Sequence, residues 1–496
     1  MEPLSVATDT SRPHLSADLL AQANKLFRSG RLDEAHAGYL KVVEIAPDDP
    51  SVHHNLGCVR QEQGDPEGAV AFYREALRLD PRLRVTRHNL TTCLVRLDRS
   101  DECIDIWCAD DLLDADDVAW LDRQSWLALL AHDLSAAGEY ARVHAAVRLG
   151  SAWYPRSSPP SRTAPLESRL TLPKLRHDIE QFGYLQRRAL LGEEFTDIIT
   201  AYQETISRLE AAGEHGPVPM DAIAQRAIGH VYGRIVHVRD TPRVPRALSD
   251  AWDPVEVENR YIDQPPGVVV IDHFLSPEAL DKLQSFCLES TVWSGNRYAH
   301  GRLGAFFRDG FTCPLLLQIA EEVRDALPRV IGKRHPLRQL WAFKNENDFP
   351  ADSNTHADFA AVNLNFWITP TDANLDTESG GLVVYGVDAP LDWDFATYNS
   401  RREVIEPYLR QQHAKPFRIP YRQNRAILFN SDLFHGTDGL HFRPGFENRR
   451  VNITMLYGER ADDELHRSSS YGSPGVKRLS EAWRSPVFTR HRGIRP

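Results

Sequence analysis

Three side chains in the last third of the sequence have the types and the order that a metal ion requires. His356 and Asp358 are separated by one residue, just before the apolar run "AAVNLNFWI", and His435 follows the strand-like segment "NRAILFN". Two neutral imidazoles and one carboxylate on one face of a metal leave three adjacent positions open, which suits Fe(II) with a bidentate co-substrate and O2. Taken alone, the His-x-Asp pair also fits a polar turn in which Asp358 accepts backbone hydrogen bonds.

A basic residue heads the last strand-like segment, "RRVNITMLYG", and it could hold a carboxylate within the same domain. A carboxylate buried in a barrel requires a cationic partner, and a guanidinium contacts it through two parallel hydrogen bonds. Arg450 is our choice for this role, and Asn452 and Thr454 share its face because side chains alternate along a strand. Arg449 is the alternative, although its side chain would point to the opposite face.

The elements that must position these residues are short and rich in β-branched and aromatic residues. From Leu337 onward they read "LRQLWAFK", "AVNLNFWIT", "GGLVVYG", "NRAILFN" and "RRVNITMLYG", separated by turn-forming residues. Short strands of this kind predict an antiparallel β-sandwich or jelly-roll barrel. A helix with Ser276 as its N-cap and Pro277 at its first position precedes them. We therefore expect a β-rich domain over residues 256–462.

Four segments together, "THADFAAVNLNFWITP", "SGGLVVYG", "ILFNSDLFHGT" and "NRRVNITMLYG", resemble the prolyl-hydroxylase-like branch of the Fe(II)/2-oxoglutarate-dependent dioxygenases. The resemblance covers residues 256–460 and implies a double-stranded β-helix flanked by helices. It implies that His356, Asp358 and His435 hold Fe(II). It further implies that Arg450 holds the distal carboxylate of 2-oxoglutarate, and that O2 is the other co-substrate.

Two details of this resemblance leave alternatives. His441 is a second candidate for the distal ligand, but "FNSDLFH" matches the strand, turn and histidine of the family, so we choose His435. Many relatives carry a tyrosine on the strand after His-x-Asp that also contacts the co-substrate. Here Trp367 lies near that position, and Asn365 could donate the hydrogen bond instead. Asn363 and Asn365 could equally form a network inside the barrel wall.

The chemistry implied by the resemblance is hydroxylation of a C–H bond, and the substrate class stays open. A prolyl, aspartyl or asparaginyl side chain of a protein is one candidate, and a small molecule is the other. A non-catalytic scaffold with a metal-binding barrel is a third reading. Inactive relatives usually lose a ligand or the basic residue, and none is missing here, which favours catalysis.

The N-terminal region repeats itself with a period of 34 residues. The segments "LFRSGRLDEAHAGYLKVVEIAPDDP" and "VRQEQGDPEGAVAFYREALRLDPRL" align glycine with glycine, alanine with alanine, tyrosine with tyrosine and proline with proline. They resemble tetratricopeptide (TPR) repeats, specifically over residues 16–83 and more loosely to 153. Such repeats form a helical solenoid whose groove binds a peptide or partner protein, so we expect a partner there. A packing or dimerisation arm is the alternative.

Composition sets the remaining expectations for this chain of 496 residues. The net charge of -11, without a basic run, argues against a nucleic-acid partner. The first residues lack the apolar core of a signal peptide, and no apolar stretch could span a membrane, so we expect a cytoplasmic protein. We assign residues 154–170 to a linker, 171–255 to a helical connector and 463–496 to a tail. Nothing indicates the oligomeric state.

Overall fold

The computed structural model describes residues 11–108, 115–150, 169–296, 301–350 and 355–460. These residues divide into two compact units, one ending at residue 108 and the other beginning at residue 115. Most of the predicted linker at 154–170 and the whole predicted tail at 463–496 lie outside the described residues. No helix in the described ranges is long and apolar enough to cross a membrane.

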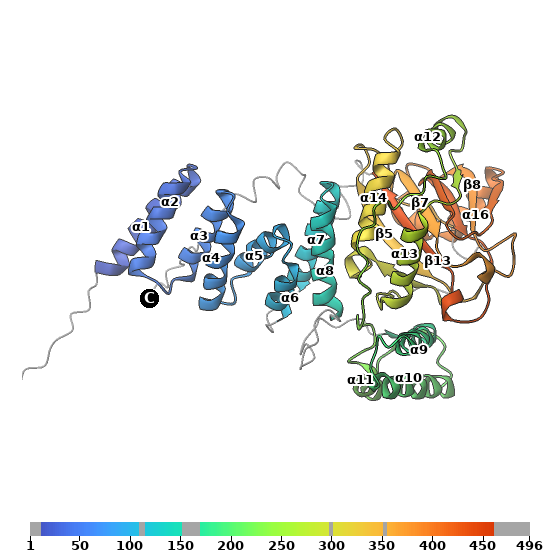
Figure 1. Ribbon diagram of the computed structural model, residues 1–496, viewed down its shortest axis with the longest axis horizontal. Helices are drawn as coiled ribbons and strands as arrows, with labels where there is room; N and C mark the ends of the chain where they lie inside the picture. The colour runs from blue at the N-terminus through green and yellow to red at the C-terminus, as the bar shows by residue number, and fades with distance from the viewer. Residues whose placement is uncertain (1–10, 109–114, 151–168, 297–300, 351–354, 461–496) are drawn as a thin grey trace, which may run out of the picture. The chain divides into compact units, whose positions relative to one another are not determined.

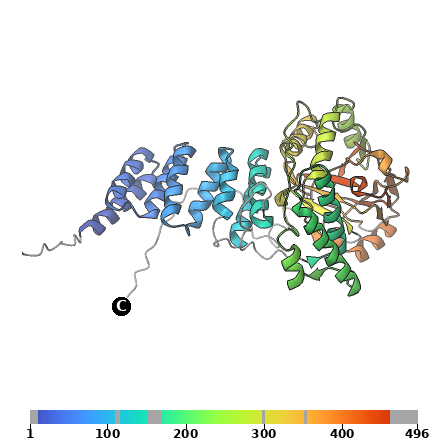
Figure 2. The ribbon, with the colours of Figure 1, turned by 60° about the horizontal axis from the view of Figure 1, so that its bottom comes forward.

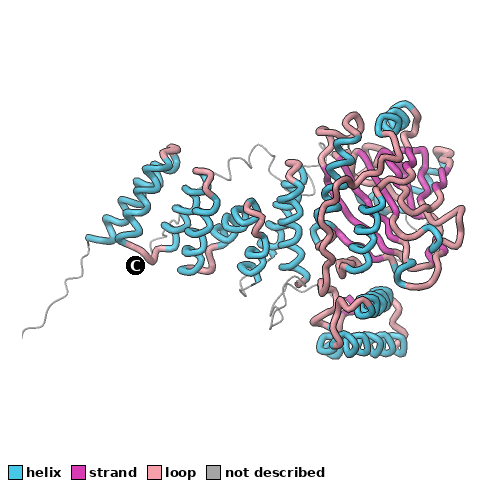
Figure 3. The backbone as a smooth tube through the Cα atoms, in the orientation of Figure 1, coloured by secondary structure: helices cyan, strands magenta, loops and turns pink. Residues whose placement is uncertain are grey.

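The described part of the first unit contains only helices, as Figure 3 shows by the absence of magenta there. They are α1 (Ser11–Arg28), α2 (Leu32–Ile45), α3 (Pro50–Glu62), α4 (Pro66–Leu79), α5 (Arg84–Arg96) and α6 (Ser100–Cys108). Each packs on its neighbours in sequence (Figure 1). Asp49 and Asp65 cap α3 and α4, and a proline opens each helix. The repeated tyrosines, Tyr39 and Tyr73, are both fully buried. The 34-residue period of the sequence therefore places equivalent core residues in successive repeats.

The second unit surrounds two antiparallel sheets with helices. The helices are α7 (Ala115–Leu130), α8 (Leu134–Leu149), α9 (Leu172–Arg187), α10 (Glu194–Ala211), α11 (Ala222–Ile228), α12 (Pro254–Asp263), α13 (Pro277–Glu289), α14 (Pro314–Ala326), α15 (Phe395–Ser400) and α16 (Arg402–Gln411). The Ser276 hydroxyl caps α13 by accepting from the backbone N–H of Ala279, with Pro277 at the first position as predicted. Figure 2 brings the small layer α9–α11 forward.

The larger sheet has six strands in the order β3-β10-β7-β13-β5-β4. Its strands are β3 (Val269–Ile271), β4 (Leu303–Phe306), β5 (Leu337–Lys344), β7 (Val362–Trp367), β10 (Ala426–Asn430) and β13 (Val451–Tyr457). A smaller sheet, ordered β11-β8-β9, contains β8 (Leu382–Asp388), β9 (Pro416–Ile419) and β11 (Leu433–Thr437). Two short pairs complete the described strands: β1 (Arg169–Leu170) with β2 (Val218–Pro219), and β6 (Asp348–Phe349) with β12 (Leu440–His441). The predicted fold, helical repeats followed by a double-stranded β-helix, is confirmed.

The two faces of the larger sheet differ in chemistry. One face is apolar and packs against α13 and α14 (Figure 1); Leu364 and Met455 belong to this core together with Leu283 and Ile319. On β7 and β13, the opposite face carries Asn363, Asn365, Trp367, Asn452 and Thr454, as the registers of these neighbouring strands require. We call this the site face, because its residues contact Asp358 and Arg450, which are described below.

Candidate metal centre and anion pocket

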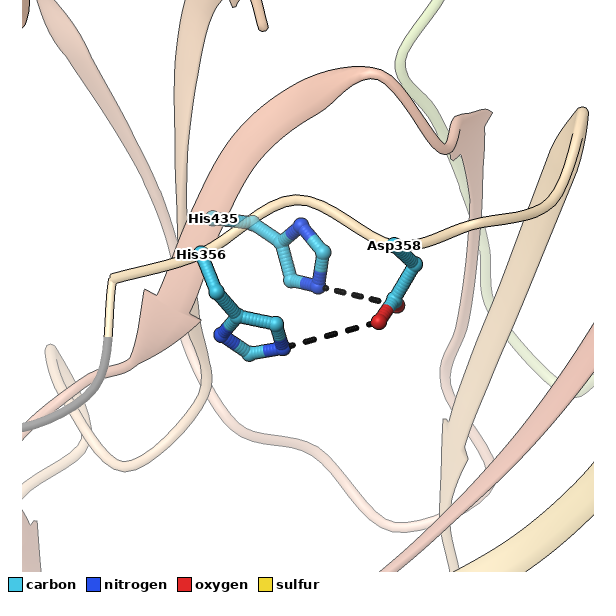
Figure 4. A group of neighbouring side chains, drawn as sticks. All are labelled: His356, Asp358 and His435. Atoms are coloured by element: carbon cyan, nitrogen blue, oxygen red, sulfur yellow. Dashed lines mark ion pairs between the residues drawn. The ribbon is translucent and has the colours of Figure 1, made fainter. Parts of the chain in front are cut away.

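The predicted metal ligands come together where the chain enters β7 (Figure 4). His356 and His435 exchange two backbone hydrogen bonds of 2.9 and 2.8 Å, which hold the entry to β7 against β11. The Asp358 N–H donates to the Ser431 carbonyl at 3.0 Å, which fixes the carboxylate beside both rings. One potential ligand atom of each residue lies within 4.8 Å of the others. The distances from Asp358 are 3.7 Å to His356 Nε2 and 3.4 Å to His435 Nε2.

The hydrogen bonds around His435 show which of its nitrogens can bind a metal. Its Nδ1 lies 2.9 Å from the Leu433 carbonyl, which can only accept, so Nδ1 carries the proton. In the neutral ring, Nε2 then directs a lone pair at the Asp358 carboxylate. Two acceptors at this distance require a cation between them, either a second ring proton or a metal ion. The donor set therefore fits a metal that accepts imidazole and carboxylate ligands.

Asp358 is ready to bind a cation because its charge is stabilised. Burial raises the pKa of its carboxyl, but the neighbouring His435 and His356 rings and the amide of Asn363 outweigh that effect and leave the pKa below its ordinary value. His441, the alternative distal histidine, is exposed and pairs instead with Asp348 at 2.8 Å. The arrangement favours His435 as the distal ligand.

Arg450 is a buried cation with no carboxylate partner among the described residues. Its side chain is 1% exposed, its Nη2 donates to the Gly381 carbonyl at 3.1 Å, and its Nε has no partner in the described part of the chain. Burial lowers the pKa of the guanidinium to about 10. The guanidinium lies over the Trp367 ring, 5.3 Å from its centroid. A buried charge requires a counter-charge, so the surroundings of Arg450 suit an anion such as a carboxylate.

Arg449 turns away from the site face, as the alternation of side chains predicts. Its Nε donates to the Glu180 carboxylate of α9 at 2.8 Å, so it already has a partner. Gly381, just before β8, can approach Trp367 closely because it has no side chain: an added Cβ would lie 1.9 Å from the Ile419 carbonyl oxygen and 2.9 Å from the Trp367 ring. These neighbours leave Arg450 as the better candidate for the anion.

The asparagines on β7 form a network inside the barrel wall, the alternative that the sequence left open. The Asn363 amide donates to Asp358 at 2.6 Å, and the Asn365 amide donates to the Asn363 carbonyl at 2.6 Å. Asn452 in turn donates to the Asn365 carbonyl at 2.9 Å. Asn365 and Asn452, the predicted contacts of the co-substrate, therefore use much of their hydrogen-bonding capacity within this network.

Tyr421 is a neighbour of Trp367 and Arg450 that the sequence did not indicate. Its ring stacks on Trp367 with centroids 5.2 Å apart, and its hydroxyl donates to the Thr369 carbonyl at 2.5 Å. Burial raises the pKa of this phenol, and the nearby Arg450 opposes that effect. Tyr421 lies between two strands, in "IPYRQNR", so no strand periodicity in the sequence indicates that its side chain lies near Arg450.

Comparison with known proteins confirms the repeats of the first unit. Families described as TPR repeat and Tetratricopeptide repeat match residues 23–64 and 50–83. A solved structure from a functional characterization of Pseudomonas aeruginosa pilF is 21% identical to this chain in sequence, with a TM-score of 0.22. The match covers 27% of this chain and 62% of that one. The chain thus spans less than two thirds of that structure.

Two further solved structures are similar to nearly half of the chain. One is the non-heme alpha ketoglutarate dependent carbocyclase SnoK from nogalamycin biosynthesis, at 12% identity and a TM-score of 0.31, covering 47% of this chain and 96% of that one. The non-heme alpha ketoglutarate dependent epimerase SnoN from the same biosynthesis also has 12% identity and a TM-score of 0.31, covering 47% and 92%. No curated protein matches this chain.

Proposed function

We propose that this protein is an Fe(II)- and 2-oxoglutarate-dependent dioxygenase that hydroxylates a C–H bond. One arrangement carries the proposal: three side chains that could hold a metal ion lie in the same barrel as a buried guanidinium that has no carboxylate partner among the described residues. When bound, Fe(II) with O2 and 2-oxoglutarate supplies the oxidising power for hydroxylation, and 2-oxoglutarate leaves as succinate and CO2.

The residues of this chain have separate roles in that reaction. His356, Asp358 and His435 would hold the metal, and three protein ligands would leave positions for the co-substrate and O2. Arg450 binds the distal carboxylate of 2-oxoglutarate, and the Trp367 ring beneath the guanidinium keeps its plane fixed. A barrel that only stored a metal would use the same three ligands but would give the buried Arg450 no function.

The substrate that we propose is a prolyl, aspartyl or asparaginyl side chain of a protein recruited by the TPR region. The confirmed repeats support this choice, because helical solenoids of this kind bind extended peptides. A small molecule with an aromatic or apolar surface is the second candidate. It is favoured by Trp341 and Phe343 of β5, which are only partly buried and lie opposite Thr454 and Asn452 of β13 on the site face.

Spectroscopy of the whole protein tests the metal and the co-substrate together. Anaerobic addition of Fe(II) followed by 2-oxoglutarate should give a weak metal-to-ligand absorption band in the visible. His435→Ala should lose the band, whereas the matched control His441→Ala should keep it. Iron binding without a band would refute the 2-oxoglutarate assignment, and a band that survives in His435→Ala but disappears in His441→Ala would reverse the choice of ligand.

Turnover separates the two classes of substrate. Succinate release from 2-oxoglutarate would be measured with cell lysate divided into protein and small-molecule pools. Stimulation by the protein pool supports the side-chain hydroxylase, and stimulation by the small-molecule pool alone supports the second candidate.

A further inference from the structure

A continuous chain of buried hydrogen bonds connects the candidate metal ligand Asp358 with the ring beneath Arg450. The Trp367 indole N–H donates to the Asn452 carbonyl at 2.8 Å, and Asn452 then donates to Asn365 at 2.9 Å. Asn365 donates to Asn363, and Asn363 donates to Asp358, both at 2.6 Å. All five side chains are almost entirely shielded from solvent. Water therefore cannot easily replace a missing partner.

The direction of this chain follows from the chemistry of its two ends. An indole N–H can only donate a hydrogen bond, and an ionised carboxylate can only accept one. Each asparagine between Trp367 and Asp358 must therefore turn its amide N–H2 toward Asp358 and its carbonyl toward Trp367. Reversal of one asparagine would bring two acceptors or two donors face to face. The orientation of every amide is thus determined, and each bond polarises the next.

A branch reinforces this direction. The Thr454 hydroxyl donates to the Asn365 carbonyl at 2.6 Å and accepts from the Asn452 amide at 3.0 Å. The Asn365 oxygen therefore has two donors, and both would be lost if that amide reversed. Arg450 lies above the Trp367 ring, so the donor end of the chain lies beside Arg450 and the acceptor end at the candidate metal centre.

We propose that Asn363, Asn365, Asn452 and Trp367 are positioning residues that fix the rotation of the Asp358 carboxylate. Asn363 occupies one side of Oδ2, so the carboxylate presents a single orientation to a metal, and the residues behind Asn363 hold its amide in the donating orientation. This inference rests on the metal site of the proposed function. It adds that a residue in contact with Arg450, Trp367, affects metal affinity through hydrogen bonds.

Binding of Co(II) alone to the whole protein tests this inference without turnover. Partners of a metal ligand typically change metal affinity by about 10- to 100-fold when they are removed. We expect Asn363→Ala to weaken Co(II) binding by about this factor and to change the d–d absorption bands that report ligand geometry. Trp367→Phe, which keeps the ring but removes the N–H, should produce a smaller change in the same direction.

A double-mutant cycle separates positioning from a general loss of stability. Once Asn363 is removed, the chain no longer reaches Asp358, so adding Trp367→Phe should cause no further loss of Co(II) affinity. Asn345→Ala is the matched control, since Asn345 is fully buried but no described residue is a hydrogen-bond partner of its side chain. It should leave both the affinity and the bands unchanged.

The outcomes distinguish this inference from the proposed function. If the wild-type protein does not bind Co(II), the metal site itself is wrong. Tight binding with unchanged affinity and bands in Asn363→Ala would overturn the positioning role and leave the metal site standing. Should Asn363→Ala fail to fold, Trp367→Phe decides alone: unchanged bands and affinity contradict the inference, and a shift in both supports it.

Discussion

Replacing Arg450 with methionine should change stability and co-substrate binding in opposite directions. The guanidinium is buried, no carboxylate in the described part of the chain pairs with it, and burial lowers its pKa to about 10. That shift corresponds to a cost of about 3 kcal/mol for keeping the charged form in place. The cost is partly offset already by the hydrogen bond to Gly381 and the Trp367 ring. Without co-substrate, the free energy of unfolding of Arg450→Met should therefore stay within about 1 kcal/mol of wild type or increase.

Co-substrate affinity should fall strongly in the same variant. Removing one partner of a buried ion pair costs about 2–5 kcal/mol, much of it from the charge left unpaired. At about 1.4 kcal/mol for each factor of ten, we expect 2-oxoglutarate to bind roughly two to three orders of magnitude more weakly. Anaerobic titration of the metal-loaded protein gives this affinity, and denaturant unfolding of the metal-free protein gives the stability.

The neighbouring arginine provides a matched control. Arg449 is also buried but is paired with Glu180 at 2.8 Å, so Arg449→Met should lower stability and leave 2-oxoglutarate affinity unchanged. The reasoning is refuted if Arg450→Met destabilises the metal-free protein by several kcal/mol while its 2-oxoglutarate affinity is retained. The guanidinium would then be a structural group, and the anion would bind elsewhere.

Three further predictions concern the repeats and the partly buried aromatic side chains of β5. Burial lowers the pKa of His54 to about 4, so as the pH falls from about 6.5 the unfolded chain binds a proton that the native protein does not. The first unit should therefore lose about 3 kcal/mol of stability by pH 4, and the His54→Gln variant should lose less. Hydrogen exchange of the backbone amides of α3 measures this stability. Gly57→Ala should destabilise the same unit by about 1–3 kcal/mol in denaturant unfolding, because the new Cβ would lie 2.4 Å from the Tyr73 ring. Trp341→Ala should raise the KM of an aromatic or apolar substrate about tenfold while 2-oxoglutarate affinity stays unchanged, since the lost contact would be worth about 1–3 kcal/mol. An unchanged KM would place the substrate elsewhere.

The sequence predicted those parts of the site that depend on strand alternation. Arg450, Asn452 and Thr454 were expected to share one face, and Asn452 and Thr454 are paired with Trp367 and Asn365 on β7. The contact of Asn363 with Asp358 could not be predicted in the same way, because it depends on how the chain turns between them. Tyr421 was missed for a similar reason, since a residue between strands has no period.

Helical periodicity identified the apolar faces of α7 and α8 but not the surfaces that they cover. The 3.6-residue pattern of residues 115–149 resembles that of the repeats before it. In the structure, Ala137, Ala141 and Ala145 of α8 join Phe311 and Leu317 in the core of the second unit. An amphipathic pattern predicts that one face of a helix is buried. Which surface covers that face depends on the shape of the neighbouring elements.

β13 divides the site face into two halves with different chemistry. Toward β7, Thr454 and Asn452 belong to a buried chain in which each amide has a fixed orientation. Toward β5, the same two residues lie opposite Trp341 and Phe343, whose rings are only partly buried. A fixed polar wall suits a co-substrate that must be held identically in every reaction cycle, whereas a partly exposed aromatic surface suits a molecule that enters and leaves. If the substrate uses this site face, the position of β13 predicts that it enters over β5, on the side of β13 away from the wall that orients Asp358.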